Sequence, residues 1–574
     1  MFLKQDKKPN GRIYLSIVRG FRDPLTKKNK SKTVRSLGYL DEWETSLDDP
    51  IAHFKQLAEE MTRQEQREDD IQLSFSLSET LSVGTDEEKN IGFLALSQIY
   101  HALGIHTFFL NRQRGLRVKY PLNNILKLLV YERILRPGSK RAAYQRRDTY
   151  LESFSFAEET LYRSLQLFAR YKDQLLLNLH ETIRMTWGRD TSHVFYDVTN
   201  YYFHTDDDHE LIRYGYSKDR KGKPIVQMGL LLDNQGLPIS YQLFPGNTTD
   251  FETLLPILSD VKKKYHLPRV IVVADKGLNS GTNKAYNLIQ GDGYIFSRSL
   301  RGTKASQAIK DYVLDPSGYI EKGEEFRLKS RVLPTQIRIE NAQGKPVHVT
   351  IEEKHIAFYS AKYARRARHQ RRAILDKAQK LIDSPSRYAK AEQYGALKYI
   401  RGMSLNKETG EIQPVDKNIL PVLDEELIRE EERYDGYYSI VTSELDMPDM
   451  EVIERYRGLW KIEESFRITK SQLETRPVYV RREDCIESHF LTCFLALLIL
   501  RLLQRHTEYR YSPQQLVSSL KKANVCHLEQ NYYKAMYYDD VLESIDEKLQ
   551  LGLNQQIWTL EEIKKRIAET KKIL

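Results

Sequence analysis

The chain has 574 residues, enough for several domains, and its 89 Lys and Arg against 79 Asp and Glu give a formal net charge of +10. The polar N-terminus argues against a signal peptide, and the longest apolar run, Phe490–Leu500, is too short to span a bilayer. Three unpatterned cysteines, Cys485, Cys493 and Cys526, lack metal-ligand spacing and suit a reducing compartment. We therefore expect a cytoplasmic protein with no membrane contact, and the positive charge is compatible with a nucleic-acid partner.

The N-terminal segment is strongly basic. Residues 1–40 carry eleven Lys and Arg against two Asp, a local charge of +9. Apolar residues alternate through it as they do in a hairpin, at Ile13, Leu15, Ile17, Val34 and Leu37. We predict a basic β-hairpin module at 1–45 that contacts DNA, with a solvated tail as the alternative. The acidic segment 46–89 predicts a linker that contains a helix.

Residues 90–190 show helical apolar periodicity and predict a helical DNA-binding domain. A basic cluster lies within it, at Arg133, Arg136, Lys140, Arg141, Arg146 and Arg147. We expect Arg136, Lys140 and Arg141 to bind DNA phosphates, and the alternative is a solvated basic surface.

Seven elements then follow in a regular order. The β-branched and aromatic run Val194–Phe203 predicts a strand with Asp197 in its middle, and the apolar run Arg269–Ala274 predicts a strand that ends at Asp275. The other five predicted elements are strands at Pro224–Asp233, Ile239–Phe244 and Tyr294–Ser297 and helices at Phe251–Tyr265 and Thr282–Ile289. An acid inside an apolar strand is costly unless it has a partner or a metal, although strand-terminal Asp residues also serve as caps.

Residues 301–435 interrupt this pattern. Their middle, Arg327–Glu352, alternates like two strands around a turn at Asn341–Gly344. A basic helix at Tyr359–Ile382 follows, and we expect its Arg365 and Arg366 to bind DNA.

A helix at Glu454–Lys470 carries a polar face. Tyr456, Glu463 and Lys470 are seven residues apart, so they lie on one side, and Arg467 is one turn beyond Glu463. The neighbouring Glu464 points about a hundred degrees away. A carboxylate beside cations and a phenol suits a metal ion that binds phosphates, and a surface helix with ordinary ion pairs is the alternative.

The element order, with acids on the first and fourth strands, resembles an RNase H-like core. From Val194 to Arg505 the chain resembles a DDE transposase of a bacterial insertion sequence, of the group with a Tyr-Arg-Glu-Lys signature. The resemblance implies that Asp197, Asp275 and Glu463 are the catalytic, metal-binding residues.

Two other signature positions match, because Tyr456 and Lys470 correspond to its phenol and lysine. The Arg position is Leu459, and Arg457 or Arg467 could supply the missing cation at the DNA. Three further stretches are similar to the group without a role that we can derive, at Gly215–Arg220, Phe244–Asn247 and Asp435–Tyr438.

The implied activity is cleavage of DNA at the element's ends and joining of the 3′ ends to target DNA. Three carboxylates favour Mg²⁺ or Mn²⁺, and two such ions can serve both attacking and leaving oxygens. The implied partners are double-stranded DNA, as terminal inverted repeats and target, and a second copy in a DNA-bound homodimer at the bacterial nucleoid. The alternatives are an RNase H-like structure-specific nuclease and a non-catalytic DNA-binding descendant.

The resemblance leaves open how the second DNA strand is cut at each end of the element. A hairpin intermediate would need an aromatic platform for a flipped base. The insertion offers Tyr312, Tyr319, Phe326, Phe358, Tyr359 and Tyr363. We expect Trp460 to pack at the catalytic helix instead.

The predicted fold class is α/β: an RNase H-like catalytic core with a large mixed insertion before the last catalytic helix, plus N-terminal β-rich and helical DNA-binding regions. The predicted segments are the module at 1–45, the linker at 46–89, the helical domain at 90–190, the core at 191–300 and 436–506, the insertion at 301–435 and a C-terminal helical region at 507–574.

Overall fold

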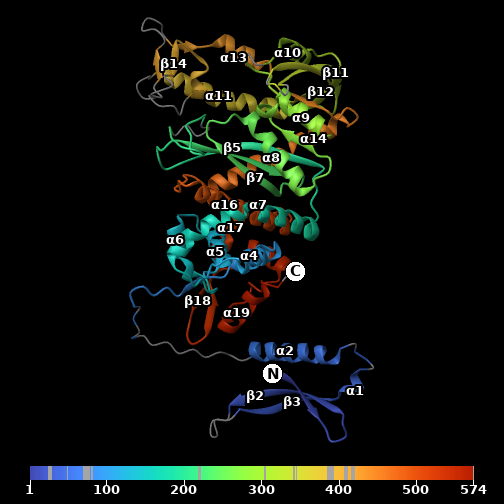
Figure 1. The fold of residues 1–574 in the computed structure, drawn as a ribbon, viewed down its shortest axis with the longest axis vertical. Helices are drawn as coiled ribbons and strands as arrows, with labels where there is room; N and C mark the ends of the chain where they lie inside the picture. Colours follow the sequence, from blue (N-terminus) through green and yellow to red (C-terminus); the bar gives the residue numbers. More distant parts are fainter. Residues whose placement is uncertain are drawn as a thin grey trace. The chain divides into compact units, whose positions relative to one another are not determined.

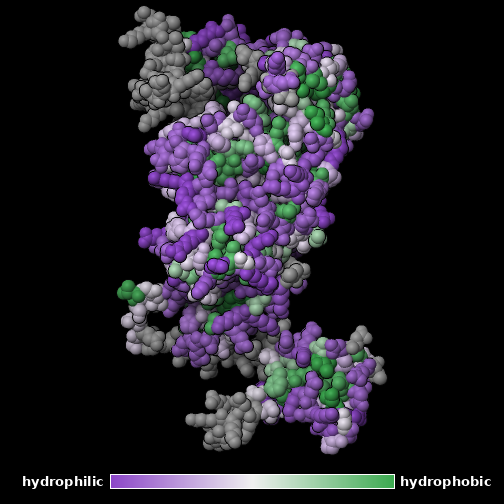
Figure 2. Space-filling model, viewed as in Figure 1, coloured by the Kyte–Doolittle hydropathy of each residue, from purple (hydrophilic) through white to green (hydrophobic). Residues whose placement is uncertain are grey.

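The computed structural model describes residues 1–572 apart from 23–28, 45, 48, 69–77, 79, 81, 217–221, 303–304, 341–342, 344, 384–393, 406–411 and 415–420. It forms two compact units, Met1–Val83 and Gly84–Leu574 (Figure 1). The visible surface of each is mostly hydrophilic, with apolar residues in small patches (Figure 2).

The first unit is a three-stranded antiparallel sheet with a helix packed on it. The sheet has the order β1-β2-β3, from Phe2–Lys7, Ile13–Arg22 and Asn29–Tyr39. The core comprises Leu15, Ile17, Val18, Phe54 and Ala58, so α2 (Pro50–Glu68) belongs to this unit, as does α1 (Leu40–Trp43). The sequence predicted only a hairpin here, because β1 is short and mostly exposed; its pairing along the free edge of β2 adds the third strand. The predicted basic residues Lys27 and Lys28 lie outside the described residues.

A nine-stranded sheet organises the second unit. Its first five strands are β5 (His193–Tyr202), β6 (Ile225–Leu232), β7 (Pro238–Pro245), β8 (Ile271–Ala274) and β9 (Gly293–Arg298). The order is β7-β6-β5-β8-β9, with β5, β6 and β7 antiparallel and with β5, β8 and β9 parallel. All seven elements predicted between 194 and 297 are present, including α8 (Asp250–Tyr265) and α9 (Gly281–Ile289).

Helices cover both faces of this sheet. On one face, α8 packs on β5, β6 and β7. On the other lie α14 (Asp449–Arg457), α15 (Trp460–Arg467) and α16 (Glu483–His506).

Helix α16 is longer than the apolar run Phe490–Leu500 indicated, and it has the length and composition to cross a membrane. In the structure, however, 94% of its most apolar window is buried inside the protein. Its rings explain that burial, since Phe490 packs on Tyr201 and Phe494 on Tyr241.

The insertion extends the same sheet. Strand β9 pairs with β17 (Tyr437–Thr442), and the sheet continues through β12 (Pro346–Ser360), β11 (Phe326–Glu340) and β10 (Ile320–Glu321). The predicted basic helix is α11 (Ala361–Asp383). Smaller helices complete the insertion: α10 (Gln307–Leu314), α12 (Tyr394–Leu397) and α13 (Glu425–Glu432). Two short strand pairs accompany them, β13 (Ile400–Arg401) with β16 (Val422–Leu423) and β14 (Met403–Leu405) with β15 (Ile412–Pro414). Most of the predicted turn at Asn341–Gly344 lies outside the described residues.

The helical region joins the C-terminal segment in one body. It comprises α3 (Phe93–Ala102), α4 (Ile105–Arg114), α5 (Leu122–Leu135), α6 (Lys140–Gln145) and α7 (Glu158–Trp187), followed near the C-terminus by α17 (Pro513–Lys522), α18 (Asp540–Leu549) and α19 (Leu560–Glu569). The Asn90 amide donates to the carbonyls of Leu520 (2.9 Å) and Ala523 (3.2 Å). Strand β4 (Glu88–Asn90) also pairs with β18 (Asn524–His527). Segments that are distant in the sequence therefore share one core.

Candidate active site

Asp197 and Asp275 lie side by side on two parallel strands. The ladder between β5 and β8 pairs Phe195 with Val273, so each Asp is two residues beyond a paired position. Adjacent strands are about 4.8 Å apart, and residues two apart point to the same face. The backbone of Asp275 remains extended (φ −79°, ψ 173°). The two carboxylates therefore lie on one face at one edge, with Asp197 half-buried and Asp275 exposed.

The third parallel strand supplies a hydroxyl to this pair. Ser297 lies on β9, which pairs with β8 at Phe296 and Ala274. Its Oγ donates a hydrogen bond of 2.7 Å to Asp275 Oδ1, and the residue is buried. The bond fixes one oxygen of the carboxylate. No sequence feature pointed to this contact, because Ser297 is an ordinary strand residue until the register of β8 and β9 is known.

The predicted helix Glu454–Lys470 is not one continuous α-helix. Helix α14 ends at Arg457, α15 begins at Trp460, and Ile468–Gln472 continues as a π-helical turn. The break lies at Gly458, which packs closely on β5. A Cβ on this residue would lie 2.4 Å from the ring of Phe195 on β5, so only glycine lets the helices approach the strand that carries Asp197. Phe195 and Asp197 share a face, which is the face covered by α14 and α15.

Tyr456 connects the third predicted acid with the other two. It is half-buried at the end of α14. Burial raises the pKa of Tyr456, the negative charge of Asp275 raises it further, and Glu463 adds to the shift. Asp275 and Glu463 therefore both act on the Tyr456 phenol, Asp275 more strongly.

The two adjacent glutamates of α15 face different surroundings. Glu464 accepts a hydrogen bond of 2.6 Å from the buried guanidinium of Arg501 on α16, and its side chain is 18% exposed. Glu463 is exposed. The hundred-degree separation on the helix thus directs Glu464 to the interior and leaves Glu463 at the surface.

The carboxylates do not form a finished metal site. Across the described residues, no three His, Cys, Asp or Glu side chains are grouped closely enough to hold an ion. The chemistry of the donors still fits Mg²⁺ or Mn²⁺, since all three are carboxylates at an accessible edge. Asp197 and Asp275 supply one side of such a site, and Glu463 would have to approach them.

Comparison with known families identifies most of the chain. The model described as "Transposase DDE domain" matches residues 188–499, more than half of the sequence. The chain belongs to the DDE transposases. The model described as "IS1634 family transposase, N-terminal domain" matches residues 3–73, so this is a transposase of an insertion sequence, and the sequence-based prediction of that family is confirmed.

Other comparisons add little to this result. No curated protein matches the transposase. A similar solved structure is described as "Cryo-EM structure of piggyBac transposase synaptic complex with hairpin DNA (SNHP)", with 9% identity over 84% of this chain and 85% of that one. Its TM-score of 0.34 is too low to equate the two folds.

The signature cations of the transposase have aromatic or acidic neighbours. The Lys470 ammonium lies 5.5 Å from the ring centre of Tyr201 on β5, and the Arg457 guanidinium lies 5.2 Å from that of Phe326. Arg467 is 71% exposed and 3.4 Å from Glu464. Leu459, at the signature's Arg position, is in the core.

The basic cluster at 133–147 is not one exposed surface. Arg133 is buried and donates to backbone carbonyls, and Arg146 is bonded to the buried Glu132 (2.6 Å). Of the three predicted phosphate contacts, Arg141 is exposed, Arg136 is half-buried, and Lys140 lines a pocket with Arg133.

Helix α11 presents some of its predicted cations outward. Arg365 is exposed and forms a bidentate pair with Glu325 (2.8 and 2.9 Å). Arg366 is also exposed, and its charge lowers the pKa of Tyr438. Arg371 is instead buried against Asp435.

An aromatic group stands beside Asp275. Tyr438 is 40% exposed and stacks on Phe358, with ring centres 5.3 Å apart and planes 8° from parallel. Tyr363 packs on its other side at 5.2 Å. Burial raises the pKa of Tyr438. Ile440 pairs with Ser297, and Tyr438 is two residues from Ile440, so the ring lies on the sheet face that carries Ser297 and Asp275. The sequence-based choice of platform omitted Tyr438 and included Phe358, which is buried.

The three unexplained sequence stretches have structural roles in the transposase. Gly215 and Gly246 touch through their backbones, because a Cβ on Gly215 would lie 2.0 Å from the Gly246 carbonyl oxygen. This contact holds the segment after β5 against the end of β7. In the third stretch, Asp435 accepts 2.9 Å hydrogen bonds from Arg301 and Arg371 and so joins α11 to the start of β17. Lys218 and Asp219 lie outside the described residues.

Proposed function

We propose that the transposase binds the ends of its insertion sequence, cleaves them and joins the 3′ ends to target DNA at a site formed by Asp197, Asp275 and Glu463. The observation that carries the proposal is the register of β5 and β8, which brings Asp197 and Asp275 to the same level of one sheet face. The packing of Gly458 on Phe195 and the common influence of Asp275 and Glu463 on Tyr456 support Glu463 as the third acid.

The strand order supports an RNase H-like core. Strands β5 to β9 form the order β7-β6-β5-β8-β9, with the first three antiparallel and the last two parallel to β5. The acids then occupy the first and fourth strands and a late helix, as the resemblance implied. Strand β17, which carries Tyr438, and β12 of the insertion continue the sheet beyond β9.

In the proposed chemistry, the protein residues hold the metal ions and the ions act on the reacting oxygens. Two bound Mg²⁺ or Mn²⁺ ions would activate the attacking oxygen and stabilise the leaving oxygen. Asp197 and Asp275 would hold them from one side and Glu463 from the other, while Ser297 keeps the Asp275 carboxylate oriented. In cleavage, water attacks phosphorus and the 3′ oxygen leaves as a hydroxyl. In joining, that 3′ hydroxyl attacks a target phosphate and displaces the target's 3′ oxygen.

The proposed partners follow from the same chemistry. Insertion-sequence ends are inverted pairs, so two copies of the transposase on two ends would form a DNA-bound homodimer. The basic first unit and the exposed cations Arg141 and Arg366 are the proposed contacts with DNA. The proposed location is the cytoplasm, at the nucleoid.

Three substitutions test the site: Asp197→Asn, Asp275→Asn and Glu463→Gln. Each removes a ligand charge without removing basic contacts, so cleavage of a labelled end duplex in Mg²⁺ should fall by about 100-fold or more while gel-shift binding stays near wild type. The matched control is Glu454→Gln, because Glu454 is exposed on the adjoining helix. Normal cleavage by any of the three variants would remove that residue from the site.

The same assay with the wild-type protein distinguishes a transposase from a nuclease and from a non-catalytic DNA-binding descendant. Cleavage with no joined product in the presence of target DNA would indicate a nuclease. End binding with no cleavage at any Mg²⁺ or Mn²⁺ concentration would indicate a non-catalytic descendant.

A further inference from the structure

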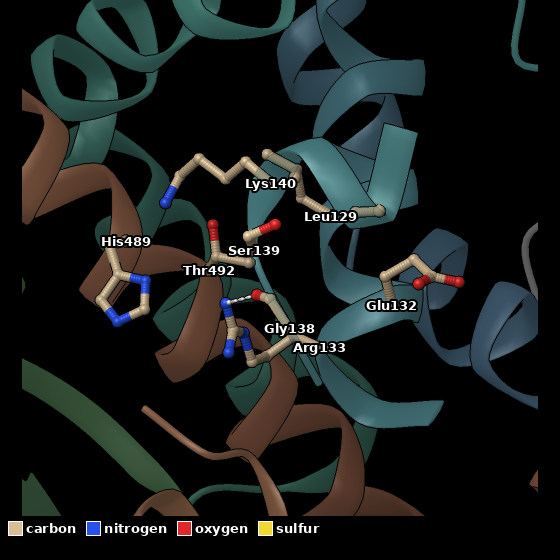
Figure 3. A pocket seen from close by; sticks show the side chains of 9 residues that line it. Leu129, Glu132, Arg133, Gly138, Ser139, Lys140, His489 and Thr492 are labelled. Atoms are coloured by element: carbon tan, nitrogen blue, oxygen red, sulfur yellow. Dashed lines mark hydrogen bonds between the residues drawn. The ribbon is translucent and has the colours of Figure 1, made fainter. Parts of the chain in front are cut away.

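A small polar pocket lies between α5, α6 and α16, apart from the proposed active site. Its lining includes Arg133, Ser139, Lys140, His489 and Thr492. The enclosed volume is about 10 Å³, room for about one water-sized group. Figure 3 shows Lys140 and Arg133 extending toward the side where His489 and Thr492 lie, while the Glu132 carboxylate points away. Gly138 and Ser139 are exposed and form the rim.

The pocket has an excess of positive charge. Arg133, His489 and Thr492 are each less than a tenth exposed. Arg133 donates only to carbonyl oxygens, those of Leu473, Glu474 and Gly138. The half-buried Lys140 lines the same pocket as the buried Arg133 guanidinium.

Among the described residues, no carboxylate pairs with Arg133 or Lys140. Glu132 lines the pocket, but its oxygens accept from Arg146 (2.6 Å) and Tyr150 (2.6 Å) instead. Within the described part of the chain, Lys140 has no ion-pair or hydrogen-bond partner. Burial, followed by the charge of Arg133, lowers the pKa of Lys140 to about 8. A buried and a half-buried cation that line one pocket repel each other, and an anion between them would relieve that repulsion.

We propose that this pocket binds a phosphate group, with one oxygen entering between Lys140 and Arg133 and with the Ser139 hydroxyl at the rim. The donors are charged or hydroxyl groups, which suit an oxyanion. The space admits a single oxygen, so the rest of the phosphate stays at the exposed rim. The same chemistry could come from a backbone phosphate of DNA or from free inorganic phosphate; the DNA source rests on the proposed function, and the free-phosphate source does not.

The position of the pocket gives binding a structural consequence. Arg133 donates to the carbonyls of Leu473 (3.2 Å) and Glu474 (3.4 Å), directly after the π-helical turn that follows α15. His489 lies 3.0 Å from the Thr475 carbonyl oxygen. A phosphate that fixes Arg133 would therefore also fix the end of the segment that carries Glu463. DNA held by the helical region would in this way support the catalytic helix.

Thermal unfolding of the full chain with inorganic phosphate, at constant ionic strength, tests the pocket. Phosphate should raise the midpoint of the wild type by a few degrees, and Lys140→Gln should lose this rise. Lys119→Gln is the matched control, because Lys119 is exposed and outside the pocket. An equal rise in Lys140→Gln and wild type would overturn the proposal. Midpoints without phosphate show whether the variant itself is folded.

The pH dependence of phosphate binding provides a second test, which compares the wild type with a variant that keeps the positive charge. The Lys140 ammonium is present below its pKa of about 8 and is lost above it, so phosphate affinity should fall by about fivefold between pH 8 and pH 9. Lys140→Arg keeps its charge and should lack this fall. An identical profile in wild type and Lys140→Arg would contradict the proposal. The titratable and charged groups facing Lys140 from α5 and α16 are Arg133, Cys485, His489 and Cys493, whereas the Glu132 carboxylate on α5 points away.

A DNA titration shows whether the phosphate in the pocket comes from the DNA backbone or from free inorganic phosphate. If a backbone phosphate occupies the pocket, Lys140→Gln should reduce the slope of log affinity against log salt by about one. An unchanged slope together with a lost phosphate response assigns the pocket to free phosphate. The variants Asp197→Asn, Asp275→Asn and Glu463→Gln should keep the rise of the unfolding midpoint with phosphate. Their cleavage activity tests the proposed function and not the pocket.

Discussion

The Ser297 hydroxyl donates a 2.7 Å hydrogen bond to Asp275, and the two residues lie at neighbouring positions on parallel strands. A carboxylate that is held in this way keeps its second oxygen available for a metal ion. Removing such a supporting contact commonly costs 10- to 100-fold in metal affinity.

Ser297→Ala should therefore raise the Mg²⁺ concentration for half-maximal cleavage by about tenfold, with a smaller effect at saturating Mg²⁺. Calorimetry with Mn²⁺ should show the same loss of affinity without relying on activity. Ser317→Ala, in an exposed turn, is the control. Equal metal affinity in Ser297→Ala and wild type would show that the hydrogen bond is only structural.

Glu464→Gln should destabilise the fold, whereas Glu463→Gln should not. The buried Arg501 guanidinium loses its charged partner in the first variant, which costs about 1–2 kcal/mol, and the exposed Glu463 has no comparable contact. Urea unfolding of both variants measures this difference. A larger loss in Glu463→Gln would mean that the two side chains are oriented the other way around.

Gly458→Ala should impair cleavage while end binding persists. The new Cβ would lie 2.4 Å from the Phe195 ring, so α14 and α15 would have to move away from β5 and carry Glu463 from the Asp pair. A displacement of about 1 Å can cost about 100-fold in rate. Gly395→Ala is the control, because a Cβ there meets nothing within 4 Å. Wild-type cleavage by Gly458→Ala would show that the helices tolerate the shift.

Tyr438→Ala should reduce any hairpin product from a pre-nicked end, whereas Tyr438→Phe should preserve it. Tyr438 presents a 40% exposed ring beside Asp275, backed by Phe358, and stacking of a base on an aromatic ring is worth about 1–3 kcal/mol. Denaturing gels detect the hairpin. Separate linear strands at every time point, with wild-type protein, would exclude the hairpin route.

Lys32→Gln/Arg35→Gln should weaken binding to the element's ends and reduce its salt slope by about two. Both side chains are exposed on β3 of the basic first unit. Fluorescence anisotropy at several salt concentrations measures the slope. The control is Lys521→Gln/Lys564→Gln, which removes two exposed charges elsewhere. Equal slopes for the first pair and wild type would assign another role to this unit.

The sequence by itself determined the elements of the core and their order. Apolar runs and turn residues identified β5 to β9 with their helices, because buried strands require continuous apolar residues whatever surrounds them. The positions of Asp197 within one strand and of Asp275 at the end of another, and the family, followed from the same patterns.

Contacts between distant segments were decided only by the tertiary structure. Position 458 requires a glycine because Phe195, far away in the sequence, occupies the space of a Cβ. Arg133 is a basic residue like Arg141 in the sequence, but folding buries it, and Ser297 reaches Asp275 only through strand register. A linear pattern records local periodicity and charge. It does not record which partner neutralises a charge or fills a space, because that depends on packing across the whole unit.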